Sequence, residues 1–189
     1  MAVPANFTTR DFTGKFTVAN KGISDSPDEV LAAQGFGWLK RKAIGLAYVT
    51  LSVKNYKDAN GVEHLDVGQA LTGGIPANSE ERALDWEEKR YNDFHFGHVI
   101  DKAKRVTDLN ELDDEHLKQG WTKDSLEHGL IETYVVSDTP KSGRSWINIQ
   151  VWGIEEINGE RRFVRRIVLT DKDGKHIAIR MVFDYLGPL

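Results

Sequence analysis

The sequence predicts an antiparallel, up-and-down β-barrel of about nine or ten strands with a small helical lid. Alternating apolar and polar residues, the pattern of half-buried strands, run through most of the chain after residue 47. Turn signals such as Asn158-Gly159 and the Lys-Asp-Gly at 172–174 separate the last strands, which therefore pair in sequence order. A helix–turn–helix with clear start and stop signals follows the first strand. Together these observations favour an all-β meander that closes into a barrel.

The first elements are a strand and two short helices. FTGKFTVAN (12–20) alternates aromatic or small residues with polar ones and predicts the first strand. SDSPDEVLAAQG (24–35) predicts a helix, because proline and acids suit its first turn and glycine ends it. GWLKRKAIGL (37–46) is a second helical piece. We therefore expect a helix–turn–helix lid over 24–46.

The remaining chain carries the other strands and one interruption. TDLNELDDEHLKQG (107–120) has leucines at helical spacing, acids early and a closing glycine, so we expect a helical insertion over 107–125. The length of 189 residues suits one domain spanning 1–189. The other predicted strands are 47–58, 61–74, 81–91, 94–106, 126–138, 145–157, 161–171 and 176–187.

Composition excludes several classes of protein. The formal net charge of −4 argues against general nucleic-acid binding, which needs a basic face. The chain has no cysteine, so disulfides, thiolate zinc sites and cysteine nucleophiles are excluded. The N-terminus has no apolar run that fits a signal peptide, and no stretch approaches the roughly 18 apolar residues of a membrane span. These features predict a cytoplasmic protein.

The stretch QGFGWLKRKAIGLA (34–47) raises two questions. Its glycines follow a helix inside an antiparallel pattern, so they predict helix punctuation rather than a dinucleotide loop. Its cations, Lys40, Arg41 and Lys42, have two interpretations: a solvated helix face, or a lid edge in transient contact with an anionic membrane surface. In the second interpretation three apolar lid residues cover the cavity or enter the membrane: Phe36, Trp38 and Leu39.

A closed barrel of this strand number leaves room inside for one small ligand. We expect neither a metal nor a cofactor there. His95 and His98 are three residues apart on a predicted strand, so they face opposite sides and cannot share one ion. No Ser-His-Asp order or nucleophile elbow stands out.

At several of these segments the chain resembles the intracellular lipid-binding proteins, the fatty-acid-binding branch of the calycin, lipocalin-like superfamily. DFTGKFTVAN is similar to the first strand of that family, and Gly35, Gly37 and Arg41 are similar to its second helix. The resemblance implies that INIQVWG (147–153) sends a Gln and a Trp into the cavity. It also implies that FVRRIV (163–168) carries an inward Arg that grips a carboxylate.

The predicted ligand-binding residues combine this resemblance with strand alternation: Asn148, Gln150, Trp152, Phe163, Arg165, Tyr134, His98 and Phe183. Two alternatives stay open. Ile147, Ile149 and Val151 could pack inward and leave the amides in water. Arg165 could be an exposed cation paired with acids across the hairpin rather than a buried group that needs an anion.

The last strand, 176–187, bears on the head group of the ligand. In the family this strand often holds an Arg-x-Tyr pair that completes the carboxylate clamp, whereas here it reads IAIRMVFDY. If the apolar set with Ile179 and Met181 faces inward, Arg180 points outward. If the register shifts by one, Arg180 faces inward and Val182 stands where the Tyr would be. Either register leaves the clamp incomplete.

Three functions follow. The favoured one is a barrel that binds a hydrophobic, lipid-like small molecule, with an acidic head group as an option. The alternative is a small cofactor-independent isomerase or cyclase of secondary metabolism, which folds a reactive chain in the same cavity. In that case His98, Tyr134 and Arg165 would act as acid, base or oxyanion partner. The third is a structural barrel with a filled interior.

Overall fold

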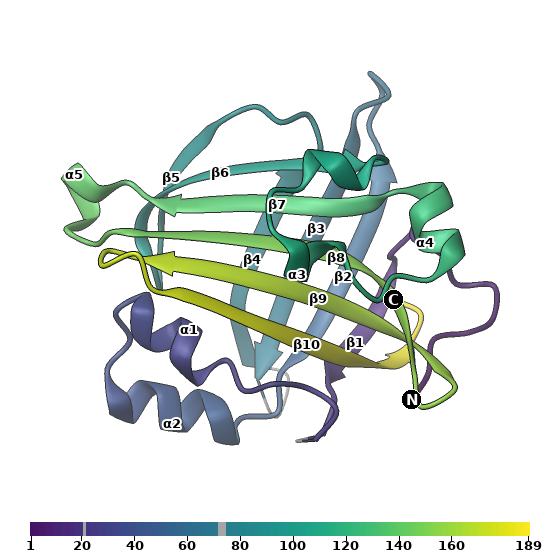
Figure 1. Ribbon diagram of the computed structural model, residues 1–189, viewed down its shortest axis with the longest axis horizontal. Coiled ribbons are helices and arrows are strands. Elements are labelled where there is room, and N and C mark those ends of the chain that lie inside the picture. The colour runs from purple at the N-terminus through teal and green to yellow at the C-terminus, as the bar shows by residue number, and fades with distance from the viewer. Residues whose placement is uncertain (21, 72–74) are drawn as a thin grey trace.

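The computed structural model describes residues 1–20, 22–71 and 75–189. Ten antiparallel strands form one sheet in the order β4-β3-β2-β1-β10-β9-β8-β7-β6-β5, which curls around an interior (Figure 1). This arrangement confirms the predicted fold class. The strands are β1 (Gly14–Val18), β2 (Thr50–Lys57), β3 (Glu63–Leu71), β4 (Ile75–Ala83), β5 (Lys89–Asp93), β6 (Gly97–Val106), β7 (Leu130–Ser137), β8 (Trp146–Ile157), β9 (Glu160–Asp171) and β10 (His176–Gly187).

Helices occupy the two predicted regions and, in the described residues, one further place. The lid consists of α1 (Asp28–Ala33) and α2 (Trp38–Leu46), which lie at one end of the curled sheet (Figure 1). The insertion between β6 and β7 holds the 3-10 turn η2 (Leu109–Glu111), α3 (Glu115–Lys118) and α4 (Lys123–His128). The short helix α5 (Thr139–Ser142) connects β7 and β8. In the described residues, no helix is long and apolar enough to cross a membrane.

The strand boundaries differ from the prediction around residues 75–96. The predicted strand 81–91 is two strands, because β4 ends at Ala83 and Trp86 adopts φ 62°, which breaks the extended chain. The β4 sequence IPANSEERA contains turn formers, yet β3 supplies its backbone partners. The last three residues of the predicted strand 61–74, which are 72–74, lie outside the described residues.

Two other predicted strands begin late. Residues 94–96, predicted as the start of a strand, form a turn in which the Asp93 carboxylate accepts from the His95 and Phe96 amides at 2.7 and 2.9 Å. Residues 126–128, predicted as the start of the next strand, belong to α4. Both differences shorten a strand without changing its partners.

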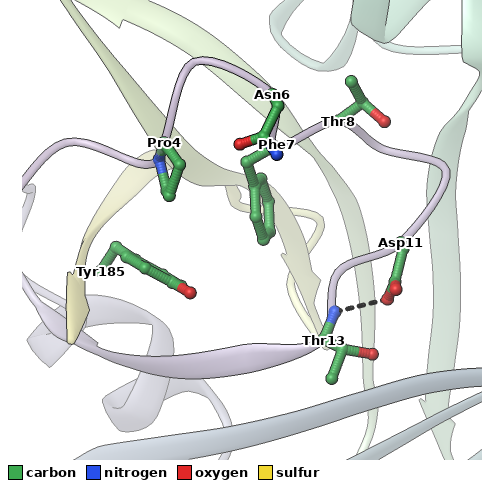
Figure 2. Close-up of a pocket in the computed structure, with 7 residues that line it drawn as sticks. All are labelled: Pro4, Asn6, Phe7, Thr8, Asp11, Thr13 and Tyr185. Carbon is green, nitrogen blue, oxygen red and sulfur yellow. Dashed lines mark hydrogen bonds between the residues drawn. The ribbon is translucent and has the colours of Figure 1, made fainter. Parts of the chain in front are cut away.

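The N-terminal segment closes the end of the barrel that lies opposite the lid. Its Val3 and Phe12 are buried in the aromatic core, and Phe7 packs against that core. Beside this segment lies a hollow of about 350 Å³ (Figure 2). The ring centres of Phe7 and Tyr185, which both line it, are 5.8 Å apart, and the two rings are tilted by 55°. Asp11 accepts a hydrogen bond from the Thr13 amide at its rim, at 2.8 Å.

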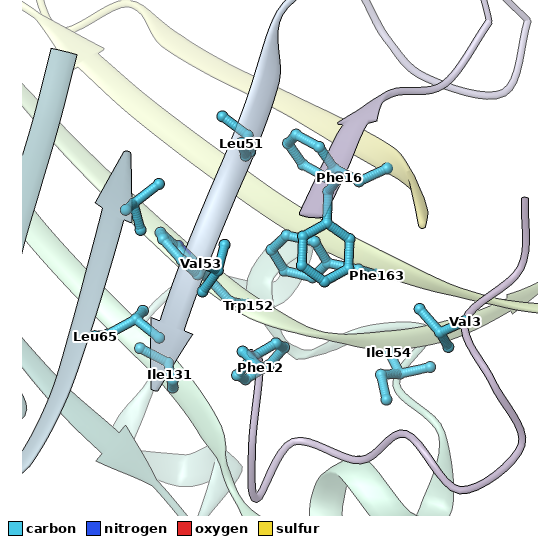
Figure 3. Close-up of a cluster of buried hydrophobic side chains, with 12 residues drawn as sticks. Val3, Phe12, Phe16, Leu51, Val53, Leu65, Ile131, Trp152, Ile154 and Phe163 are labelled. Atoms are coloured by element: carbon cyan, nitrogen blue, oxygen red, sulfur yellow. The ribbon is translucent and has the colours of Figure 1, made fainter. Parts of the chain in front are cut away.

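The half of the interior next to this segment is filled by aromatic and aliphatic side chains, with a group of phenylalanine rings at its centre (Figure 3). The Phe163 ring lies 4.9 Å from Phe183, 5.0 Å from Phe16 and 5.4 Å from Phe12. Such clusters bury large apolar areas in a fixed geometry. The filled half therefore provides a rigid floor for whatever lies above it.

The insertion covers the outer face of the sheet. Leu112, Leu117 and Trp121 are buried there against outward-facing valines of β8, β9 and β10. Under the insertion, Arg166 donates from Nε to Glu155 Oε1 at 2.6 Å and from Nη1 to the His116 carbonyl at 3.2 Å. The outer face of β9 is therefore as dry as its inner face, and its charges are paired within the protein.

Candidate active site

A cavity of about 440 Å³ lies between the aromatic floor and the lid. Its walls come from both edges and the middle of the sheet, and its cover comes from α1 and α2. Most of the walls are apolar, which suits a small hydrophobic molecule. Representative wall residues are Val99, Val135, Ile167, Ile179 and Met181, with Phe36 from the lid.

The strand register stacks the wall in layers. Trp152, Arg165 and Met181 lie opposite one another on β8, β9 and β10, and form the layer directly above the floor. The next layer toward the lid has Gln150, Ile167 and Ile179 in the same relation. Because side chains alternate along a strand, all these residues share the inner face with Phe163 below them. This register fixes Arg165 at the bottom of the cavity.

Arg165 is the most unusual residue of the cavity. The residue is only 8% exposed, and its guanidinium carbon lies 3.6 Å from the centre of the Trp152 ring. Within the described residues, Nε and Nη2 have no hydrogen-bond partner. Burial lowers the pKa of Arg165 to about 9, because the charged form loses its hydration; the neighbouring Arg82 charge adds to this, and Glu80 opposes it.

A second charged group lines the wall near β4. Arg82 pairs with Glu80 on its own strand and donates from Nε to Asp101 Oδ2 at 2.9 Å. The Tyr91 hydroxyl donates to the same Asp101 oxygen at 3.1 Å. Unlike Arg165, this arginine has its charge matched by the protein. The sequence analysis missed this cluster, although Glu80 and Arg82 show the two-residue spacing of one strand face.

Burial and the neighbouring charges together shift the pKa values of this cluster. Burial acts to raise the pKa of Glu80, but the Arg82 charge outweighs it, so the pKa lies below its ordinary value. For Asp101, burial dominates and raises the pKa despite Arg82. Burial, followed by the Asp101 charge, raises the pKa of Tyr91. The cluster therefore holds Tyr91 as a neutral donor.

The cavity also contains uncharged polar atoms without partners among the described residues. They are buried atoms on the β8 face and on the turn before β6: Asn148 Oδ1, Trp146 Nε1, Trp152 Nε1 and His95 Nδ1. Buried polar atoms are normally hydrogen-bonded, so a group of open ones facing one cavity indicates a polar ligand group.

The structure brings several predicted ligand-binding residues together. Asn148, Gln150, Trp152 and Arg165 line the cavity, as does Phe36 of the lid. The inward face of β8 is thus the polar one, and Val151 packs outside. Phe163 and Phe183 lie in the floor instead, with their ring centres 5.5 and 5.1 Å from the Arg165 guanidinium. That any of them binds a ligand stays a prediction.

Four other predicted site residues do not reach the cavity. Thr133 and Val135 line it from β7, so Tyr134 between them faces outward. The Tyr134 ring packs against Trp86, with their ring centres 6.3 Å apart. His98 faces outward because Val99 takes the inner position on β6. Trp38 and Leu39 are 64% and 76% exposed, which places them on the outside of the lid.

The last strand adopts the first of the two registers considered. Ile179 and Met181 line the cavity, so Arg180 points outward, where its Nη1 approaches Glu155 Oε2 at 3.5 Å. Val182 is buried on the outer face. Arg165 is consequently without a second arginine or a tyrosine from β10, and the carboxylate clamp of the fatty-acid-binding pattern is incomplete.

Arg144 joins the lid to the opposite wall of the cavity. Its Nη1 donates to the carbonyls of Gln34, His95 and Phe96 at 3.2 to 3.4 Å, which joins the turn between α1 and α2 to the β5–β6 turn. Phe36 packs on Phe96 at 5.3 Å across the same gap. Within Trp38–Leu46 no side chain is buried, so α2 is a thin cover.

The cations of the lid have different environments. Lys40 lines the cavity rim with its Nζ 4.6 Å from the Phe36 ring centre. Arg41 donates to Asp28 Oδ1 at 3.1 Å and to the Phe36 carbonyl at 2.9 Å, and so serves the lid itself. Lys42 is exposed. Membrane contact through these residues stays a prediction. In the described part of the chain, no group of three or more His, Asp or Glu residues is arranged to hold a metal ion.

Solved structures with a similar fold are lipid-binding proteins. Apo lipid binding protein 8 of Caenorhabditis elegans has a TM-score of 0.55 and 14% identity, covering 96% of this chain and 100% of that one. The fatty acid-binding protein from Drosophila melanogaster brain has a TM-score of 0.54 and 12% identity, covering 92% and 98%. At such identities the likeness shows the fold alone: the chain has the fold of the fatty-acid-binding proteins, as the sequence resemblance predicted.

Curated relatives share the chain almost from end to end. The probable pericyclase scpY of Mollisia scopiformis is 30% identical over 190 residues, which cover 99% of this chain and 96% of the relative. The pericyclase pydY of Acremonium sp is 31% identical over 194 residues, covering 100% and 98%. No model of a known protein family matches the sequence. The chain belongs to the family of these pericyclases.

Proposed function

We propose that this protein is a cofactor-independent pericyclase, which holds one apolar, unsaturated small molecule in its cavity and converts it to an isomer. The full-length relationship to two pericyclases carries this proposal. It agrees with the alternative function drawn from the sequence, an isomerase or cyclase, better than with the favoured function of a carrier. Binding of a hydrophobic small molecule is the first step in either case.

The cavity suits a reaction that needs shape more than reactive side chains. In a pericyclic reaction the bonding electrons reorganise through one cyclic transition state; in an intramolecular cycloaddition, for example, two π bonds become two σ bonds. Neither a nucleophilic side chain nor a net proton transfer is required. The main task of the enzyme is to hold the chain in the folded conformation that brings the reacting carbons together. A volume of about 440 Å³ with apolar walls above a rigid aromatic floor restricts the chain in that way.

Burial supplies the affinity for such a molecule. Apolar surface removed from water contributes roughly 25 cal/mol per Å², and the walls from Val99, Val135 and Ile179 offer that surface. Loss of conformational freedom in the substrate opposes binding and is the cost of the folded shape. The cytoplasmic location expected from the sequence stays a prediction, and so does membrane contact, which was one of two interpretations of the lid cations.

Turnover by the purified protein tests the proposal. The substrates are conjugated polyenes that carry a tethered alkene, and the readout is chromatography with mass detection. We expect products of unchanged mass with a shortened chromophore. Recovery of every bound polyene unchanged, across a series of tether lengths, would contradict a pericyclase and favour a carrier.

A matched pair of variants ties the activity to the cavity. Val135→Trp fills the cavity from β7, and Tyr134→Trp places the same side chain one residue away on the outer face. Filling the cavity should abolish both binding and turnover, whereas the outer variant should retain both. Equal activity of the two variants would place the reaction outside this cavity.

A further inference from the structure

We propose that Arg165 is the hydrogen-bond donor for a neutral carbonyl oxygen of the substrate, conjugated with the π system that reacts. The substrate class is therefore a conjugated ketone or acyl compound rather than a free fatty acid. This inference deepens the proposed function and rests on it. It starts from the two guanidinium nitrogens of Arg165 that lack a partner in the described part of the chain.

An unpartnered buried guanidinium calls for an acceptor. Burying a hydrogen-bond donor without an acceptor costs free energy, and this cost is larger when the donor is charged. The Arg165 side chain cannot leave for water, because its plane lies 3.6 Å from the Trp152 ring centre between walls of β8 and β10. Stacking on an aromatic face leaves the edge of the guanidinium as the direction for hydrogen bonds. The unpaired N–H groups of Arg165 therefore lie at the bottom of the cavity, where an oxygen of a bound molecule could accept their hydrogen bonds.

The charges around the cavity favour a neutral oxygen. Two guanidinium groups, Arg82 and Arg165, stand against two carboxylates, Glu80 and Asp101, so the deep part of the site is balanced without a ligand. A carboxylate ligand would add an unbalanced negative charge beside these acids in an apolar enclosure, which is costly. A carbonyl oxygen accepts the hydrogen bonds and leaves the balance unchanged.

The orientation of the last strand supports the same choice. Arg180 points outward to Glu155, and Val182 is buried on the outer face, so β10 provides neither an arginine nor a tyrosine beside Arg165. The layer contributes Met181 instead. A single donor group with apolar neighbours matches a carbonyl attached to a hydrocarbon chain better than a carboxylate, which accepts several charged hydrogen bonds.

Such a contact would act on the reaction itself. When two ends of a conjugated chain form new σ bonds, electron density moves toward a carbonyl conjugated with one of them and returns as the bonds complete. A fixed cation in a dry site stabilises that transient charge on oxygen, and loss of one such donor typically lowers the rate by about 10²- to 10³-fold. No atom is gained or lost, and Arg165 keeps its proton throughout.

Binding and vibrational spectroscopy of one probe series test the site apart from turnover. The probes share a linear C16 chain with four conjugated double bonds and end in a methyl ketone, a carboxylate, an alcohol or a hydrocarbon. The ketone carries ¹³C at its carbonyl. Wild type is compared with Arg165→Met and Arg165→Lys, and Arg180→Met is the matched control because it removes an arginine from the outer face.

We expect wild type and Arg180→Met to bind the ketone about 10- to 100-fold more tightly than the hydrocarbon. The bound ketone should show a lowered ¹³C=O stretching frequency and a red-shifted absorption. Arg165→Met should lose both spectral shifts and the affinity difference, and Arg165→Lys should keep a weaker shift. Loss of the shifts with the probe still bound separates donation by Arg165 from a merely structural role.

Three outcomes would overturn the inference. One is an unchanged carbonyl frequency in wild type, or failure of the ketone to bind. Another is an equal shift in wild type and Arg165→Met. A third is Arg165-dependent binding of the carboxylate that exceeds ketone binding, which would assign an acid-binding site. A carbonyl shift without any isomerisation of tethered polyenes would leave the site standing and contradict the proposed pericyclase instead.

Discussion

Each face of β9 buries an arginine, but the arginine is paired on the outer face and lacks partners for two of its nitrogens, among the described residues, on the inner face. Arg165 and Arg166 are neighbours in sequence and are 8% and 7% exposed. Arg166, on the outer face, donates to Glu155 at 2.6 Å and to the His116 carbonyl under the insertion. Arg165, on the inner face, has three aromatic rings close to its guanidinium and two nitrogens without hydrogen-bond partners among the described residues.

The segments that cover the two faces also differ: the insertion on the outer face is held more firmly than the lid on the inner face. The insertion buries Leu112, Leu117 and Trp121 on the outer face, and Arg166 holds it by donating to the His116 carbonyl at 3.2 Å. The lid over the inner face buries Val30 and Phe36, and Arg144 joins it to the opposite turn. The outer face is thus complete as a structural unit. The inner face carries a less anchored cover and, among the described residues, a guanidinium with unsatisfied hydrogen-bond donors. Both are properties expected of a site that admits a ligand.

Breaking the outer pair should give the largest loss of stability. Arg166→Met leaves Glu155 buried with only Arg180 nearby, at 3.5 Å. Removal of one partner of a buried ion pair costs about 3–5 kcal/mol, because the remaining charge is uncompensated. Chemical denaturation measures the free energy of unfolding. The double variant Glu155→Gln with Arg166→Met should recover part of the loss. A change below about 1 kcal/mol in the single variant would show that the buried pair does not stabilise the outer face.

Matched glycine substitutions compare the two covers. Gly120 has φ +80°, and a Cβ there would lie 2.7 Å from Arg166 Nη2 and 2.9 Å from Glu155 Cδ. Gly35 has φ +88°, and its nearest atom would be Arg144 Nε at 3.1 Å, on a flexible side chain. We expect Gly120→Ala to cost about 2–3 kcal/mol and Gly35→Ala about 1 kcal/mol. The same unfolding measurements check this order, and a larger loss at Gly35 would reverse our description of the covers.

How much of this comparison the sequence could predict depends on the strand. Alternation and turn signals predicted the meander, and the lid and the insertion followed from helix punctuation. On β8 both faces carry large side chains, so alternation left the inward face open, and the resemblance to the lipid-binding proteins favoured Asn148, Gln150 and Trp152. These residues do line the cavity.

Three parts of the site were beyond sequence reasoning. Tyr134 and His98 each adjoin an apolar residue that faces inward, and parity along a strand cannot be fixed without its partners. The Glu80–Arg82 pair lies on β4, whose proline, asparagine and serine are typical of a turn. Arg165 and Arg166 are the same residue type at consecutive positions of β9. Only the packing on each face of the strand distinguishes their roles.

Removing the inner arginine should have the opposite sign from removing the outer one. Arg165→Met deletes a buried charge that no described carboxylate contacts and leaves an apolar side chain among aromatic rings. We expect the free energy of unfolding of the ligand-free protein to stay equal or to rise, by up to about 2 kcal/mol. Chemical denaturation at neutral pH decides this. A loss comparable to that of Arg166→Met would mean that Arg165 is a structural residue.

Alkaline pH should reduce the difference between wild type and Arg165→Met. Burial lowers the pKa of Arg165 in the folded protein to about 9, whereas the unfolded chain keeps the ordinary, much higher value. The folded state therefore holds this proton less tightly, and the unfavourable buried charge is present below about pH 9 and is relieved as pH rises above it. Unfolding curves of both proteins between pH 7 and pH 10.5 give the difference directly, because effects of all other groups cancel. A constant difference across that range would show that Arg165 keeps its charge in the empty cavity, and that its nitrogens are better solvated than the geometry indicates.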